Sequence, residues 1–130
     1  MRVRCKINDL AAIDSSARVR LSLSINRSGP DYGLEIDEDY VVYAVELMRG
    51  GIWIYIETSG RDYPFPYPIE FFEIVDSSIP VHWLIAAPYR PGSAAIISFE
   101  KWVRDHDFYE KLLNDSPASV SAYRSETQDK

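Results

Sequence analysis

Hydrophobic and polar residues alternate along much of the chain, and this alternation predicts half-buried β-strands. Residues 2–7 place Cys5 and its apolar neighbours on one face and basic side chains on the other. Residues 17–26 alternate in the same way. We expect strands in both segments, although a short helix capped by Ser15 or Ser16 is an alternative for the second.

The clearest local prediction is a β-hairpin over residues 40–58. Two runs that are rich in β-branched and aromatic residues flank Gly50 and Gly51, which is typical of a tight hairpin. With these glycines as the two loop residues, Leu47 faces Ile54 and the aliphatic side chains share the core face. The opposite face then carries aromatic and acidic side chains, namely Trp53, Tyr55 and Glu57.

Proline occupies every second position from Pro64 to Pro68. This spacing excludes a helix and a central strand, because proline has no N–H to donate. We expect a stiff, polyproline-like segment that presents its aromatic side chains. Beyond it, the patterns predict a strand over 70–75 and a second strand over 81–86 that pairs with it. Residues 95–99 are either a short strand or the segment that leads into a helix.

Apolar residues between Phe99 and Asn114 recur at helical spacing, which predicts an amphipathic helix. Ser98 is its expected N-cap, and the Asp-His-Asp sequence at 105–107 is a point at which the helix can break. The sequence after Pro117 is polar, as in a frayed tail.

These elements predict one β-rich α+β domain over residues 1–115, followed by a flexible polar tail over 116–130. The expected architecture is a strongly bent antiparallel sheet or a small, partly open barrel with a C-terminal amphipathic helix. The length of 130 residues fits a single domain.

Charge is distributed unevenly around a formal net charge of −6. Residues 1–30 hold six bases and two acids, residues 31–76 hold eleven acids and two bases, and the remainder is nearly neutral. The overall acidity argues against nucleic acid or an anionic membrane as the main ligand. The acidic middle third is either a solvated surface or a patch that steers a basic partner.

Aromatic residues are concentrated in the same region, since residues 40–83 hold ten of the seventeen in the chain. Some must fill the core, and Tyr43, Trp83 and either Phe71 or Phe72 are the expected ones. Strand alternation and the proline segment direct others outward. Tyrosine and tryptophan beside acidic residues are typical anchors of protein interfaces.

Cys5 is the single cysteine, so it makes neither an internal disulfide nor a thiolate metal site. We expect it to be a buried strand thiol in a cytoplasmic protein. The charged segment 1–7 is unlike a secretory signal, and the apolar stretches are shorter than the roughly 20 residues that span a bilayer.

No motif for catalysis, a metal or a cofactor stands out in the sequence. His82 lies in an apolar alternation and is expected to be a core or edge-strand residue. His106 lies between Asp105 and Asp107, but consecutive residues of a helix point in different directions. We therefore expect a protein that is not an enzyme and has no cofactor.

Several aromatic stretches together resemble the immunity proteins of polymorphic toxin systems, which are small bacterial proteins. The stretches that carry the resemblance lie at 39–45, 53–56, 67–76, 83, 98–102 and 108–109. The resemblance extends over about residues 39–113 and rests on aromatic strand positions. It implies a cytoplasmic protein that binds and neutralises a toxin domain, and it implies no catalytic residues.

The function expected from these features is protein binding, of the immunity type, through an acidic and aromatic surface. A basic toxin domain is the expected partner, because opposite charge speeds association. The expected partner-binding residues are Glu35, Asp37, Glu38, Asp39, Trp53, Tyr55, Glu57, Asp62, Tyr63 and Tyr67. The alternative is a β-barrel that binds a small ligand or a peptide, with the tyrosine-proline segment at the lip of its pocket.

Overall fold

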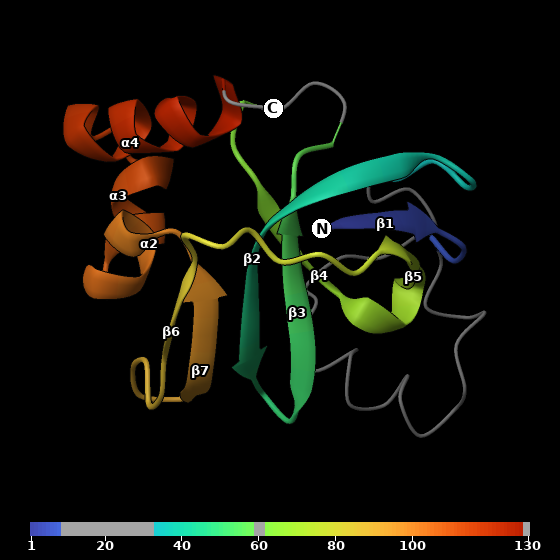
Figure 1. Cartoon of the computed structure of the whole chain (residues 1–130), viewed down its shortest axis with the longest axis horizontal. Coiled ribbons are helices and arrows are strands. Elements are labelled where there is room, and N and C mark those ends of the chain that lie inside the picture. The colour runs from blue at the N-terminus through green and yellow to red at the C-terminus, as the bar shows by residue number, and fades with distance from the viewer. Residues whose placement is uncertain (9–32, 59–61, 129–130) are drawn as a thin grey trace.

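An antiparallel sheet of seven strands forms the centre of the described chain (Figure 1). The computed structural model describes residues 1–8, 33–58 and 62–128. The predicted strand over 17–26 lies outside these residues. The strands are β1 (Arg2–Cys5), β2 (Asp39–Met48), β3 (Gly51–Ile56), β4 (Phe65–Pro68), β5 (Phe72–Asp76), β6 (Leu84–Ala86) and β7 (Ser93–Ser98).

Strand β2 organises the sheet, because it pairs with three other strands. Its first residues pair with β1, and its later residues pair with β3 and β7. β4 continues the sheet beyond β3, β5 continues it beyond β1, and β6 pairs with β7. β2 curves strongly along its length (Figure 1), with a register shift between Val42 and Ala44. The predicted α+β fold with a bent antiparallel sheet is therefore confirmed.

The β2–β3 hairpin forms as predicted, but its register differs. The two loop residues are Arg49 and Gly50, so Met48 pairs with Gly51 and Leu47 pairs with Ile52. Both loop residues have positive φ angles, 51° and 71°, as a type I′ turn requires. The predicted pairing across a Gly50-Gly51 loop is wrong by two positions. The predicted core position of Leu47 is also wrong, because its side chain is 37% exposed at the end of the hairpin.

The proline-rich segment is an edge strand. β4 pairs with β3 only, and Pro66 lies opposite Tyr55. An edge is where alternate prolines are tolerated, because their missing N–H groups face away from the neighbouring strand. The predicted pairing of the next two strands is wrong, since β5 pairs with β1 and β6 pairs with β7.

Three helices follow the sheet: α2 (Glu100–Arg104), α3 (Phe108–Leu113) and α4 (Pro117–Gln128). The predicted break at 105–107 is confirmed. Phe99 rather than Ser98 precedes α2 as its N-cap, and the Ser98 hydroxyl instead donates to the Tyr43 carbonyl oxygen at 2.6 Å. The expected frayed tail is a helix, whose Tyr123 is buried against the rest of the protein.

The interior consists of two hydrophobic clusters that share the central strands. Ile54 and Ile56 belong to the cluster that includes Val3 and Phe71, together with a short 3-10 helix at Ile69–Phe71. Tyr55 belongs to the second cluster, which the three helices cover. From Trp53 to Ile56, β3 is consequently buried on both faces. Within the described residues, no helix is long and apolar enough to cross a membrane.

Candidate functional site

A groove of about 1000 Å³ lies between the turn of the β2–β3 hairpin and the loop that joins β6 to β7. We call it the hairpin groove. One wall is formed by residues 47–52 and the other by residues 88–94, and His106 reaches it from the link between α2 and α3. A concave site of this volume is large enough for a small molecule or a short peptide segment.

The walls of the hairpin groove are mainly apolar. Leu47 and Ile52 are cross-strand partners, and they remain 37% and 39% exposed. Pro88 and Pro91 line the opposite wall. Because exposed aliphatic side chains in a concave surface gain free energy when a ligand covers them, this surface favours an apolar occupant.

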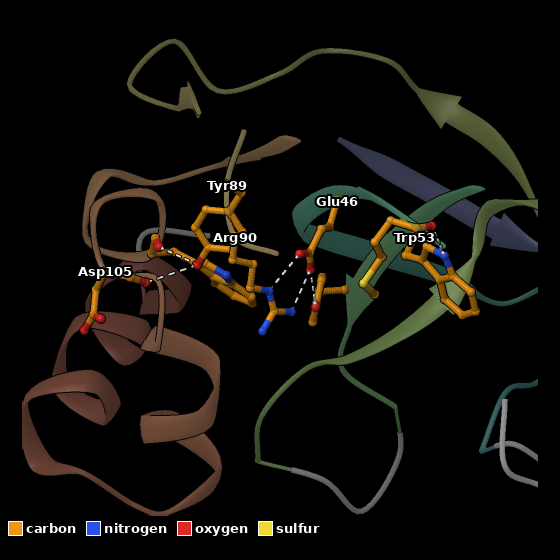
Figure 2. Close-up of polar contacts among 8 residues, drawn as sticks. Glu46, Trp53, Tyr89, Arg90 and Asp105 are labelled. Carbon is orange, nitrogen blue, oxygen red and sulfur yellow. Dashed lines mark hydrogen bonds and ion pairs between the residues drawn. The ribbon is translucent and has the colours of Figure 1, made fainter. Parts of the chain in front are cut away.

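An ion pair lies beside the hairpin groove, with its carboxylate fully inside the protein (Figure 2). Glu46 is 0% exposed and accepts hydrogen bonds from Arg90, from Nε at 3.2 Å and from Nη2 at 3.4 Å. The Tyr55 hydroxyl also donates to Glu46, at 2.6 Å. Burial next to this carboxylate raises the pKa of Tyr55 well above its ordinary range. Arg90 and Tyr55 therefore satisfy the charge of Glu46, which would otherwise be costly inside the protein.

Tyr89 fixes the β6–β7 loop to the helices. Its ring is buried, and its hydroxyl lies 3.1 Å from the carbonyl oxygens of both Trp102 and Asp105 (Figure 2). Burial raises the pKa of Tyr89, so the hydroxyl keeps the proton that it donates. His106 contacts the same ring edge-on, with centroids 5.4 Å apart.

Trp53 fixes the opposite wall in a comparable way. Its indole Nε1 donates to the Met48 carbonyl oxygen at 3.0 Å, directly before the turn (Figure 2). The guanidinium of Arg49 lies 6.0 Å from the centre of the Trp53 ring, as in a cation–π contact. Both walls are thus held by side chains anchored in the protein, which makes the hairpin groove preformed.

Three of the four aromatic anchors predicted from the sequence are not surface residues. Trp53, Tyr55 and Tyr67 are 2%, 1% and 4% exposed, so their predicted place on a partner-binding surface is wrong. The reason is that the helices cover one face of β3 and the first hydrophobic cluster covers the other, which strand alternation alone does not reveal. Tyr63 is half-buried beside Phe65, with ring centroids 5.6 Å apart.

The predicted acidic residues of segment 35–39 are exposed, but two of them are paired with the basic strand β1. Asp37 accepts from Lys6 at 2.9 Å, and Asp39 accepts from Arg4 at 2.8 Å. The pairing with Arg4 lowers the pKa of Asp39. The basic side chains of β1 thus lie against part of the acidic middle third and compensate part of its charge.

The other two acids predicted for the site, Glu57 and Asp62, have surroundings that differ from those of segment 35–39. Glu57 is half-buried and accepts a hydrogen bond from the Tyr123 hydroxyl of α4, while Asp62 is exposed. His82, which was expected in the core or in an edge strand, is exposed and lies in a turn before β6. Its Nε2 lies 2.9 Å from a Glu126 carboxylate oxygen. Cys5 is buried and free, as predicted.

Sequence reasoning missed the residues that form the hairpin groove. The one available signal was Glu46, a charged residue inside an otherwise apolar strand. Its partner Arg90 is 44 residues away, and no local pattern predicts that contact. Comparisons with protein-family models, with curated proteins and with solved structures found no match for this chain.

Proposed function

We propose that this chain is a non-enzymatic protein-binding module, and that its partner docks a segment in the hairpin groove. The observation that carries the proposal is the pair of aliphatic side chains, Leu47 and Ile52, which remain exposed side by side in a concave surface. A partner side chain that covers them would bury apolar area on both molecules.

The preformed walls also support this proposal. Tyr89 ties one wall to the helices, and Trp53 ties the other to the end of β2. A site that is already ordered loses little conformational entropy when it binds, so more of the contact energy contributes to affinity.

The resemblance to immunity proteins makes a toxin domain the first partner to test. In this form of the proposal, the chain neutralises the toxin by occupying its surface, and exposed acids of segment 35–39 attract a basic toxin electrostatically. Glu35 and Glu38 are exposed acids for which the described residues provide no ion-pair partner.

Affinity capture from the native cell tests the proposal, with the wild-type chain, Ile52→Asp and Ile74→Asp as baits. Ile74 is a matched control, because it is 45% exposed on β5 and does not line the hairpin groove. We expect a protein that the wild type and Ile74→Asp capture equally and that Ile52→Asp loses. Retention of every captured protein by Ile52→Asp would show that the hairpin groove is not the docking site.

Co-expression of the captured protein with this chain tests the immunity form. We expect the partner to inhibit growth when it is expressed alone, and growth to recover with the wild type but not with Ile52→Asp. A partner without toxicity would limit the function to protein binding.

A further inference from the structure

The hairpin groove carries basic side chains on both walls. Arg49 comes from the β2–β3 turn, Arg90 from the β6–β7 loop, and His106 from the link between α2 and α3. Among the described residues that line the groove, none is Asp or Glu. Asp105 lies next to His106 in the chain, but Lys111 binds its carboxylate at 3.0 Å.

Both arginines are held in position. The Arg49 guanidinium lies over Trp53, and the Arg90 guanidinium lies 5.7 Å from the centre of the Tyr89 ring. Glu46 also fixes Arg90 through Nε and Nη2. The third guanidinium nitrogen of Arg90, Nη1, is not hydrogen-bonded to Glu46 (Figure 2). Glu46 therefore orients a guanidinium that keeps further N–H groups for another acceptor.

We propose that the hairpin groove selects a segment that carries a carboxylate next to apolar side chains. This inference rests on the proposed function and names the chemistry of the docked segment, which is an apolar peptide that ends in a free C-terminal carboxylate. The apolar walls cover the side chains, and the oriented guanidinium of Arg90 donates to the carboxylate.

Arg49 is essential to this selectivity because Glu46 already balances the charge of Arg90. The excess positive charge of the hairpin groove therefore comes from Arg49, with His106 adding to it when protonated. A neutral apolar segment would contact the apolar walls but would offer no negative charge to the arginines. A phosphate ion would bind the arginines but would leave the apolar walls uncovered, so neither ligand matches both features of the groove.

Nuclear magnetic resonance titration tests the proposal with the peptide N-acetyl-Ala-Leu-Leu, as its free acid and as its C-terminal amide. We expect the acid to shift the backbone amide signals of Gly50 and Gly92, which line the two walls. The amide should bind at least about tenfold more weakly, since it lacks a charge-assisted hydrogen bond.

A variant separates the charge effect from the apolar contact. Arg49→Gln should weaken binding of the acid and leave binding of the amide unchanged. Arg49 is exposed, so this variant keeps the fold even if removal of Arg90 unfolds the protein. Arg124→Gln removes an exposed arginine of α4, outside the hairpin groove, and should bind both peptides like the wild type.

Equal binding of the acid and the amide would overturn the carboxylate inference and leave the groove as an apolar docking site. Inorganic phosphate that shifts the same signals as strongly as the acid would also overturn it, as would an absence of any groove shift. The proposed function fails separately, when Ile52→Asp retains all captured proteins.

Discussion

Glu46 shows how one buried residue constrains the chain at the scale of single side chains. Its carboxylate has no exposure to solvent and depends on Arg90 and Tyr55 for its hydrogen bonds. A buried pair of this kind adds little net stability, but the loss of one partner is costly because the other charge is left uncompensated.

The ion pair can be tested by a double-mutant comparison. Arg90→Met should lower the free energy of unfolding by about 3 kcal/mol. Combining it with Glu46→Gln should recover a large part of that loss, because the charge is gone and Tyr55 keeps an acceptor. Urea denaturation measures both. If the double variant is less stable than Arg90→Met alone, the charge of Glu46 is not what makes the single change costly.

Three buried tyrosines predict that the free energy of unfolding decreases at alkaline pH. Burial raises the pKa of Tyr55, Tyr89 and Tyr123 above the ordinary value of about 10. Their contribution is complete below pH ~10 and decreases above it, because the unfolded chain then releases protons that the folded chain retains. Denaturant melts at rising pH should show this decrease.

Tyr123→Phe provides the control for the alkaline prediction. It should make the decrease of stability above pH ~10 shallower, since one tyrosine with a raised pKa no longer contributes. An unchanged slope would mean that the folded protein ionises Tyr123 as readily as the unfolded chain does.

At this scale the sequence predicted the burial of Cys5 and of either Phe71 or Phe72, of which Phe71 is buried, but not that of Trp53. Alternation on a single strand distinguishes two faces and does not say whether another layer covers each of them. Here helices cover one face of β3 and the first hydrophobic cluster covers the other. Burial of Trp53 is therefore a property of the whole fold.

The β2–β3 turn can be tested at the scale of elements. Gly50 has a φ of 71°, a conformation in which a Cβ atom is strained. Gly50→Ala should therefore destabilise the protein by about 1 kcal/mol. Gly51, which lies in β3 without a positive φ, is the matched control. Equal losses in the two alanine variants, measured by thermal unfolding, would exclude turn strain as the cause.

Helix α4 gives a second test at this scale. Tyr123 is 2% exposed and packs edge-on against Tyr43, with ring centroids 5.4 Å apart. Tyr123→Ala should cost about 3–4 kcal/mol, as truncation of a buried aromatic ring does. Ser121→Ala, at an exposed position of the same helix, should have little effect. If the two variants melt alike, α4 does not contribute to the folded core.

Elements were predictable where their signal is local. The hairpin follows from alternation and glycine position, and the helix break at 105–107 follows from composition. Helix α4 was missed because few of its residues are apolar, so its stability depends on Tyr123 and its neighbours packing against the sheet. The pairing of β5 with β1 joins segments about 70 residues apart, and no local pattern encodes it.

Charge acts at the scale of the whole molecule, and the fold changes its meaning. Residues 31–76 hold eleven acids against two bases and so carry the acidity of the chain. However, β1 brings Arg4 and Lys6 into contact with Asp39 and Asp37. These contacts are at the surface, so they contribute little to stability. Their effect is to reduce the acidic field that segment 35–39 presents to a partner.

If the partner is a basic toxin domain, the exposed acids Glu35 and Glu38 control the rate of association. Replacing both with lysine should slow association by about tenfold at low ionic strength, because steering by opposite charge is lost. The effect should diminish in high salt, which screens charges over a few ångströms. Lysine at Glu100 and Glu110, exposed acids of α2 and α3, gives the same net charge and should slow association less. Stopped-flow kinetics measures both variants, and equal slowing would mean that only the net charge of the molecule matters.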